Sequence, residues 1–280
     1  MNLQNAHLQP RISKKAPFSV EVPGVEAVPG ETIPRRLPAA KDGLILIPAV
    51  GVETTYDVFR RSARVFGNTK AVASRRLIKT HEENKTVKVV IDGVENEVDK
   101  KWTYFEMSPY SYKSFVEYEQ MALQLGAGLK KLELEPGNKI HLYGATRPTC
   151  IISENWLAMS HGAASQSLTI VTAYDSLGED GLKHSLVQTS SDVKSIKHII
   201  WNSHLAPEQA DLKRLKTEYA DIKLISFEDL RMLGEQNLVE PVPPSPEDLC
   251  CIVYTSGSNG LPKGVPLTHK NVIAVTAGIN

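Results

Sequence analysis

Residues 254–264 carry the side chains in this sequence that are best suited to binding a phosphate. The segment reads YTSGSNGLPKG, with three glycines, several small polar residues and Lys263, and it directly follows the apolar run 249–253. Glycine lets backbone N–H groups turn toward an anion because no Cβ atom is in the way. Hydroxyl groups add hydrogen-bond donors, and a lysine adds a positive charge. A buried strand that runs into such a turn can hold a polyphosphate, so we predict a phosphate-binding loop here.

The segment differs from two well-known phosphate-binding patterns. The P-loop of nucleotide hydrolases, G-x-x-x-x-G-K-S/T, requires a second glycine where Pro262 stands and a Ser or Thr where Gly264 stands. The kinase loop G-x-G-x-x-G does not fit the spacing of Gly257 and Gly260. The alternative is a Gly/Ser-rich surface turn that binds no ligand. A chance turn is not expected to contain Pro-Lys-Gly in register, so we favour the functional interpretation.

The whole segment resembles the signature of adenylate-forming enzymes, Tyr/Phe-Thr-Ser-Gly-Ser/Thr-Thr-Gly-x-Pro-Lys-Gly. This group includes acyl-CoA synthetases, luciferases and the adenylation domains of peptide synthetases. One position departs from the pattern, where an asparagine replaces threonine; its side chain can also donate an N–H group to a phosphate oxygen. The resemblance implies that the β- and γ-phosphates of ATP contact Thr255, Ser256, Gly257, Ser258, Asn259, Gly260 and Lys263. It also implies that Mg2+ bridges those phosphates.

Other segments are similar to fungal long-chain fatty acyl-CoA synthetases. They are residues 21–24, 31–36, 57–63, 102–105 and 171–178. In that family a fatty-acid carboxylate attacks the α-phosphate of ATP, pyrophosphate leaves, and the thiol of CoA then displaces AMP from the acyl-adenylate. The resemblance therefore implies a long-chain fatty acid–CoA ligase that uses a long-chain fatty acid, ATP, Mg2+ and CoA.

The resemblance reaches only part of such an enzyme. The family motifs that hold adenine and ribose, the hinge and the catalytic lysine have no match in this sequence. We therefore expect an N-terminal part of a ligase that has no complete catalytic set and little activity alone. The alternative is a non-catalytic module, derived from such an enzyme, that binds a nucleotide or a partner.

Composition indicates a globular protein without a charged binding surface. The 280 residues include 32 Lys+Arg and 32 Asp+Glu, so the formal net charge is zero and the overall composition points neither to nucleic acid nor to an anionic membrane surface. No stretch approaches the roughly 20 apolar residues of a membrane span. Without a secretory signal we expect a cytoplasmic protein. Peripheral attachment to endoplasmic reticulum, lipid droplet or peroxisome membranes is an open alternative.

Hydrophobic periodicity predicts an α/β fold behind a proline-rich arm. Six prolines between residues 16 and 50 indicate an extended segment, so we divide the chain into an arm, 1–50, and an incomplete adenylation domain, 51–280. A hairpin is expected over 85–104, turning at Asp92-Gly93. The expected helices are 54–66, 114–131, 151–162, 177–188 and 207–219, and the expected strands are 139–145, 168–173, 196–201, 222–227 and 249–253. This alternation predicts a mostly parallel sheet flanked by helices, with ligands beyond the carboxyl ends of its strands.

Several other side chains could take part in binding or catalysis, but we favour structural roles for them. The arginine pairs 60–61 and 75–76 could bind CoA phosphates, but solvated surface positions are the favoured interpretation. The aromatic residues Trp102, Tyr104 and Phe105 could line an acyl tunnel, but core packing is preferred. The histidines are expected to be structural or exposed, with a polar role near the loop left open for one of them; they are His161, His184 and His269.

Overall fold

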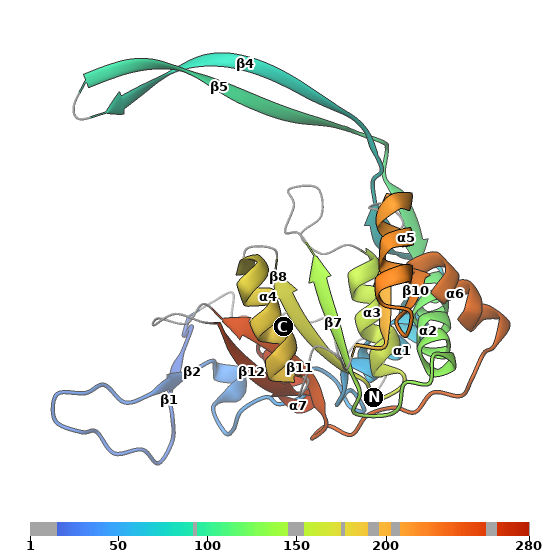
Figure 1. Cartoon of the computed structure of the whole chain (residues 1–280). Helices are drawn as coiled ribbons and strands as arrows, with labels where there is room; N and C mark the ends of the chain where they lie inside the picture. Colours follow the sequence, from blue (N-terminus) through green and yellow to red (C-terminus); the bar gives the residue numbers. More distant parts are fainter. Residues whose placement is uncertain are drawn as a thin grey trace.

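A four-stranded sheet forms the centre of the computed structural model, which describes residues 16–91, 94–144, 154–174, 177–189, 196–202, 208–255 and 262–279 (Figure 1). The strand order is β12-β11-β8-β7. The bounds are Lys139–Gly144 for β7, Thr169–Tyr174 for β8, Leu249–Thr255 for β11 and Lys263–Thr268 for β12. Strands β7, β8 and β11 run parallel, whereas β12 is antiparallel to β11. The predicted mostly parallel sheet is confirmed, with an antiparallel return strand added at its edge.

Helices cover both faces of this sheet. The main core lies on the face that carries Ile140, Ile170 and Cys251, beneath α1, α2 and α3. These helices span Thr55–Phe66, Phe115–Lys131 and Glu154–Ala164. The other face carries Tyr254 beneath α4, which spans Gly178–Thr189. Burial on both faces explains why β8 is almost wholly buried, as expected for a central strand of a parallel sheet.

Two of these helices, α1 and α2, begin with capping boxes, which fix their first turns. In α1, Thr54 Oγ1 accepts from the N–H of Asp57 at 3.2 Å, and the Asp57 carboxylate accepts from the N–H of Thr54 at 2.9 Å. Ser114 and Glu117 form the same reciprocal pair at the start of α2. Each pair satisfies two N–H groups that have no partner within the helix. The helices predicted over 54–66 and 114–131 are confirmed.

The remaining predicted elements are present with shifted ends. The predicted helix 151–162 corresponds to α3 and 177–188 to α4, while 207–219 corresponds to α5, Gln209–Glu218. Residues 151–153 and 207 lie outside the described part of the chain. Strands β9, His198–Trp201, and β10, Lys223–Ser226, pair in parallel as a separate small sheet. Sequence reasoning missed β3 Lys70–Ser74, β6 Ser111–Ser114, α6 Phe227–Gln236, β12 and α7 His269–Ile279.

The described part of the N-terminal arm is largely exposed and carries little regular structure. Its two short strands, β1 Val20–Glu21 and β2 Arg35–Arg36, pair antiparallel. One 3-10 turn, η1, follows over Pro38–Ala40. The guanidinium of Arg35 donates to the Glu21 carboxylate at 3.1 Å and holds the two strands together. An extended segment was expected here because of its prolines.

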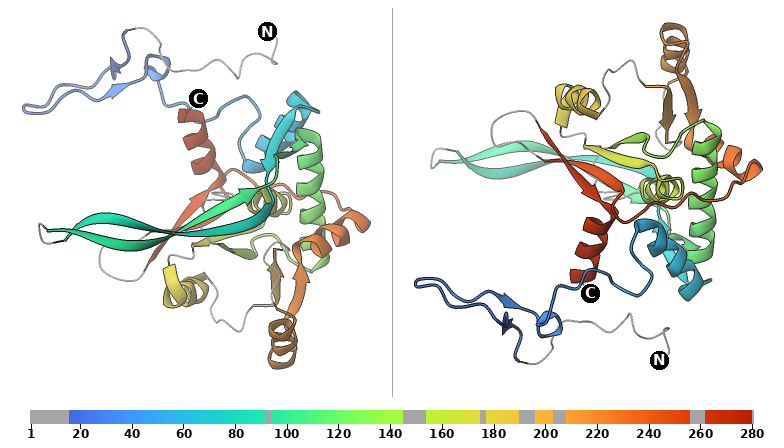
Figure 2. Two further views of the ribbon diagram at one scale, coloured as in Figure 1. Left: turned by 90° about the horizontal axis from the view of Figure 1, so that it is seen from above. Right: turned by 90° about the horizontal axis from the view of Figure 1, so that it is seen from below.

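A long two-stranded hairpin projects from the body of the protein (Figures 1 and 2). It consists of β4, Leu77–Ile91, and β5, Val94–Met107, which pair antiparallel along almost their entire length. The predicted hairpin 85–104 is confirmed and is longer than expected; its Asp92-Gly93 turn lies outside the described residues. The core packing predicted for three aromatic residues is wrong, because Trp102, Tyr104 and Phe105 lie on β5 and are 41%, 41% and 42% exposed.

Glycines allow α2 and α6 to cross in direct backbone contact. A Cβ atom added at Gly234 of α6 would overlap the carbonyl oxygen of Gln124 in α2. A Cβ atom added at Gly128 of α2 would overlap the carbonyl oxygen of Leu230 in α6. The interhelical approach therefore has no room for a methyl group on either side.

We expect Gly234→Ala to lower the free energy of unfolding by about 1–3 kcal/mol, because α6 must move away from α2 to accommodate the methyl group. Urea unfolding followed by circular dichroism measures the change. Gly278→Ala in α7 is the matched control, since no atom lies within 4 Å of its added Cβ; alanine there should be neutral or slightly stabilising. Unchanged stability of Gly234→Ala would contradict the close crossing.

Candidate functional site

The structure brings the two ends of the predicted phosphate-binding loop together. Thr255 is the last residue of β11, Lys263 is the first residue of β12, and the two are direct partners in the antiparallel register. The strand predicted before the loop is thus confirmed. The other predicted site residues lie outside the described part of the chain; they are Ser256, Gly257, Ser258, Asn259 and Gly260.

This pair of residues stands at the edge of the sheet where ligands of parallel sheets commonly bind. Because β7, β8 and β11 run parallel, their carboxyl ends lie at one edge, marked by Gly144, Tyr174 and Thr255. Thr255 and Lys263 are both exposed there. Among the described residues, the ammonium group of Lys263 has no ion-pair partner. The lysine charge is therefore available to an anion at the position where sheet topology favours a ligand.

Helix α4 holds the chain on both sides of the loop. Tyr254 is buried, with 4% of its surface exposed, and its hydroxyl donates to the carbonyl oxygen of Ser185 at 3.1 Å. Burial raises the pKa of Tyr254, so the phenol remains a donor. On the far side, His184 Nε2 lies 3.1 Å from the carbonyl oxygen of Pro262. Since a carbonyl only accepts, Nε2 donates this bond.

Gly264 has a packing role in the same region. A Cβ atom there would lie 3.1 Å from Ile252 Cγ2 and 3.3 Å from Cζ of the Tyr254 ring. The glycine therefore lets β12 pass close to the tyrosine that anchors the loop. Sequence reasoning assigned glycines here to anion binding and missed this contact, together with the contact of His184. Neither could be deduced locally, because α4 lies about 70 to 80 residues before its partners in the chain.

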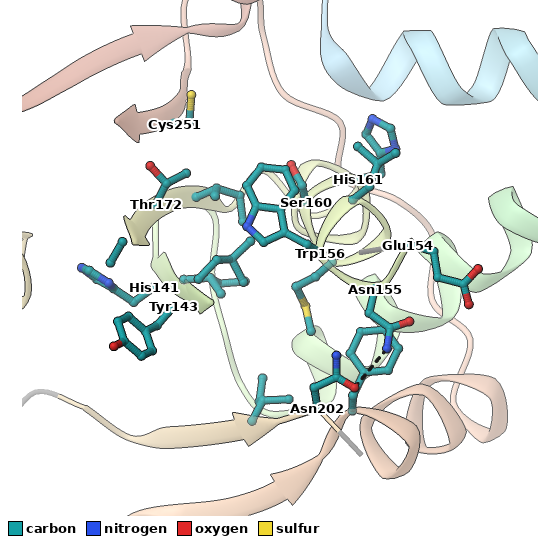
Figure 3. Close-up of a pocket in the computed structure, with 18 of the residues that line it drawn as sticks. His141, Tyr143, Glu154, Asn155, Trp156, Ser160, His161, Thr172, Asn202 and Cys251 are labelled. Carbon is teal, nitrogen blue, oxygen red and sulfur yellow. Dashed lines mark hydrogen bonds between the residues drawn. The ribbon is translucent and has the colours of Figure 1, made fainter. Parts of the chain in front are cut away.

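A wide hollow of about 2400 Å3 is lined by β7, β8, α3 and β9 (Figure 3). Tyr104 and Phe105 at the base of β5 also line it, whereas Trp102 does not. Apolar side chains such as Leu142 and Ile200 contribute to it, and Figure 3 shows the more polar lining residues. At one end, Asn155 Nδ2 donates to Asn202 Oδ1 at 3.4 Å and joins α3 to the end of β9. Thr255 and Lys263 do not line this hollow. Among the described residues of β11, Cys250, Cys251 and Val253 line the hollow.

The buried histidines in this region have structural contacts. His161 Nδ1 lies 2.7 Å from the hydroxyl of Tyr118, and its ring stacks on Phe59 at 5.0 Å. Burial lowers the pKa of His161 to about 4. His269 accepts from the N–H of Thr55 at 3.3 Å, and burial lowers its pKa also. Both rings are neutral at pH 7 and support the packing of α1, as expected for structural histidines.

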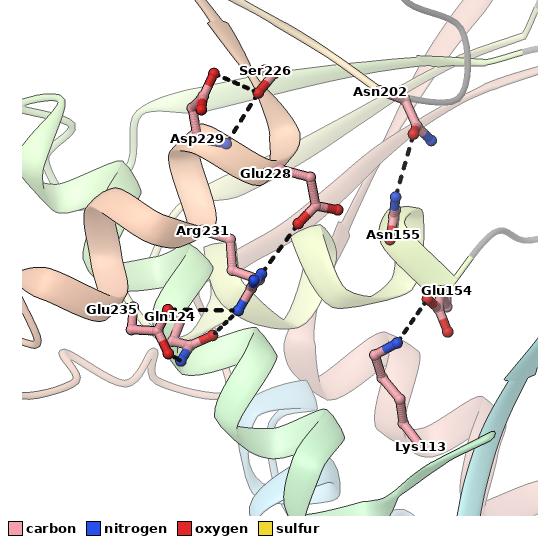
Figure 4. Close-up of polar contacts among 10 residues, drawn as sticks. All are labelled: Lys113, Gln124, Glu154, Asn155, Asn202, Ser226, Glu228, Asp229, Arg231 and Glu235. Atoms are coloured by element: carbon pink, nitrogen blue, oxygen red, sulfur yellow. Dashed lines mark hydrogen bonds and ion pairs between the residues drawn. The ribbon is translucent and has the colours of Figure 1, made fainter. Parts of the chain in front are cut away.

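A second group of polar residues forms hydrogen bonds and ion pairs within and between helices and strands (Figure 4). Arg231 of α6 donates to Gln124 of α2 at 3.0 Å and pairs with Glu228 at 3.3 Å. Lys113 of β6 pairs with Glu154 at the start of α3, at 3.1 Å. These contacts join elements that already pack together, so we assign this group a structural role.

Two arginines that were weighed as CoA ligands have partners within the protein. Arg60 pairs with Glu119 of α2 at 2.7 Å. Arg75 donates to the carbonyl oxygen of Ser108 at 2.7 Å and lies over the ring of Tyr110. These contacts support the surface interpretation. Separately, none of the helices within the described ranges is long and apolar enough to cross a membrane.

The fold is that of part of an adenylation domain. The adenylation domain of carboxylic acid reductase from Segniliparus rugosus superposes with a TM-score of 0.56 at 15% identity, covering 84% of this chain and 40% of that one. The corresponding domain of the Mycobacterium chelonae enzyme gives a TM-score of 0.53 at 18% identity. This match covers 80% of the present chain and 37% of the chelonae chain. At this level of identity the likeness concerns the fold alone.

Sequence comparison identifies the family. Residues 92–280 match the AMP-binding enzyme family, and the chain belongs to it. A palmitoyl-CoA ligase of Gibberella moniliformis is 41% identical over 281 residues, covering 94% of this chain and 40% of the ligase. Long-chain-fatty-acid–CoA ligase 1 of Schizosaccharomyces pombe is 42% identical over 256 residues, covering 85% and 36%. The chain thus spans about two-fifths of the length of these relatives.

The buried His161 predicts a pH-dependent stability. Its folded-state pKa of about 4 lies below the ordinary value of 6.5, so the unfolded chain binds more protons between these values. The free energy of unfolding should therefore fall as the pH decreases from about 6.5 to about 4, by roughly 3 kcal/mol from this residue. Urea unfolding at several pH values measures the slope. His161→Phe, which keeps an aromatic ring on Phe59, should show a smaller slope; identical slopes would contradict the assignment.

Proposed function

We propose that this chain contributes the ATP phosphate-binding part of a long-chain fatty acid–CoA ligase. One observation carries the proposal: Thr255 and Lys263 pair at the carboxyl end of β11, which closes a Gly-rich loop at the ligand-binding edge of an adenylation fold. Relatives named as long-chain-fatty-acid–CoA ligases share up to 42% identity over most of the chain. The activity is proposed for the whole enzyme, since these relatives are much longer than this chain.

The proposed role of the loop is electrostatic. Negative charge grows on pyrophosphate as its bond to the α-phosphate breaks, and donors fixed beforehand at that position lower the barrier. Lys263 would supply a positive charge, and Thr255 a hydroxyl and a backbone N–H group. The remaining donors would come from Ser256, Gly257, Ser258, Asn259 and Gly260. Mg2+ would enter with ATP as part of the substrate and offset the negative charge of its phosphates.

The proposed reaction has two steps that share one intermediate. A fatty-acid carboxylate attacks the α-phosphate of ATP, and pyrophosphate leaves to give an acyl-adenylate. The thiol of CoA then attacks the acyl carbon, and AMP leaves to give acyl-CoA. In this proposal residues 1–50 are an extended arm and residues 51–280 are part of the adenylation domain. We place the enzyme in the cytoplasm, with peripheral contact to endoplasmic reticulum, lipid droplet or peroxisome membranes.

The phosphate-binding proposal predicts the effect of removing one positive charge. Calorimetric titration of the purified chain with ATP and Mg2+ should show saturable binding. Lys263→Ala should weaken this binding by about tenfold or more, because a charge-assisted hydrogen bond to a phosphate is lost. Circular dichroism should show that the variant keeps its fold, since the side chain is exposed.

Lys270→Ala is the matched control for this titration. Lys270 is also an exposed lysine near the C-terminal end of the sequence, but it pairs with Glu247 at 2.8 Å and lies in α7, away from the loop. Its removal should leave nucleotide binding unchanged. Equal binding by wild type and Lys263→Ala, or no binding by wild type, would count against a phosphate site at this loop.

A further inference from the structure

The hairpin β4–β5 has two faces of different chemistry. Residues paired across an antiparallel ribbon share a face, and neighbours along a strand alternate. We call one side the apolar face; it carries Lys85, Val87, Val89, Val98, Lys100, Trp102 and Tyr104. The other side, the acidic face, carries Glu82, Lys88, Val90, Glu95, Glu97, Asp99 and Lys101. The long ribbon is therefore amphipathic across its thickness.

The apolar face is ordered along its length. Its valines lie toward the tip, and Val89 and Val98 are 38% and 42% exposed. Lys85 and Lys100 come next and are direct cross-strand partners. Trp102 and Tyr104 lie nearer the body. The Lys100 ammonium lies 5.4 Å from the centre of the Trp102 ring, and Lys85 Nζ donates to the Tyr104 hydroxyl at 2.9 Å.

The two faces also differ in charge. Between residues 82 and 102 the apolar face carries two lysines and one glutamate, whereas the acidic face carries two lysines and four carboxylates. Lysines placed directly opposite each other repel, which disfavours the ribbon in isolation. A negative surface against the apolar face would attract both lysines and so offset their mutual repulsion. The acidic face would point away from such a surface.

We propose that the apolar face of this hairpin docks on a lipid bilayer that contains anionic phospholipid. The valines would enter the interface, the lysines would meet lipid phosphates, and Trp102 and Tyr104 would lie at the level of the headgroups. Figures 1 and 2 show that the hairpin rises from one side of the body and arches over it at a distance, with its tip beyond the helices and the sheet. The distal part of the hairpin therefore stands clear of the body. This proposal rests on the hairpin alone and is independent of ligase activity.

Charge argues against a second copy of the chain as the occupant. A symmetric dimer through the apolar face would use the same residues from both subunits. It would bring together Lys85 and Lys100 from each, with Glu83 beside them and Glu106 nearer the body as counter-charges. A flat anionic surface avoids this repulsion. It would also give Trp102 and Tyr104, which lie next to the lysines on the same face, a headgroup region to contact.

Co-sedimentation of the full 280-residue chain with vesicles tests the proposal. The vesicles contain phosphatidylcholine alone or with about one-third phosphatidylserine. We expect binding to the anionic vesicles that weakens with added salt. Lys100→Glu should reduce this binding by at least about fivefold, whereas Lys101→Glu, its neighbour on the acidic face, should reduce it much less.

A second pair of neighbouring residues tests the apolar contact. Val89→Glu should abolish most vesicle binding, while Val90→Glu adds the same charge to the acidic face at a position that is 71% exposed, and should retain it. Anionic vesicles should also shift tryptophan emission to shorter wavelength in the wild type, and Trp102→Phe should remove that shift. All five positions lie on the projecting ribbon, and circular dichroism checks that each variant is folded.

Three results would overturn the proposal. The first is wild-type binding to anionic vesicles no stronger than to phosphatidylcholine alone. The second is an equal loss of binding in both members of either variant pair. The third is a dimer, detected by sedimentation equilibrium, that Val89→Glu dissociates while vesicle binding is absent. Titrating the same variants with ATP and Mg2+ separates a failure of the membrane proposal from a failure of the phosphate-site proposal. The hairpin variants should bind ATP as the wild type does, whatever the vesicles show.

Discussion

The antiparallel pairing of Thr255 with Lys263 is the constraint on which the candidate site depends. A Gly-rich loop has many conformations of its own, and fixing each residue has a free-energy cost of roughly 1–2 kcal/mol in lost backbone entropy. The strands on either side reduce this freedom by holding both ends of the loop at the spacing of neighbouring strands. A loop whose two ends are held loses less conformational entropy when it binds an anion. Its hydrogen-bond donors therefore cost less free energy to fix in place.

The anchors that hold this pairing come from the face of the sheet opposite the main core. Tyr254 is buried under α4 and bonded to it, and His184 of α4 bonds to Pro262. The close approach at Gly264 completes the contact, because any side chain there would press on Tyr254. The core beneath α1, α2 and α3 fixes the sheet from the other side. Both layers therefore contact the strands that carry the two ends of the loop.

Sequence reasoning succeeded where the determining interactions are local. The helices predicted over 54–66 and 114–131 and the alternation of strands and helices were readable because the interactions that define them lie a few residues apart. The return strand β12 was missed because Gly264 and Pro266 are poor strand formers, and only its pairing with β11 defines it. The contacts between α4 and the loop join residues far apart in the chain, so no local pattern contains them.

The aromatic residues of β5 show a different kind of failure. Trp102, Tyr104 and Phe105 have high strand propensity and large apolar surfaces, so composition alone favours a core position. Whether these residues are buried depends on how far the hairpin extends. The polar sequence of its proximal part did not indicate that the two strands continue to pair there. Once the ribbon is seen to leave the body, the same residues become surface groups, and their exposure requires an explanation in terms of contact rather than packing.

The neck of the hairpin connects that exposed surface to the body. Arg76 and Ser108 exchange backbone and side-chain hydrogen bonds at 2.8 and 2.9 Å, and Arg75 donates to the carbonyl oxygens of Met107 and Ser108. Just beyond the neck, β3 and β6 pair, and β6 leads directly into α2. A ribbon joined by paired bonds on both strands bends less freely than one joined by single flexible segments. A surface that held the tip would consequently restrict the orientation of the sheet and of the loop at its edge.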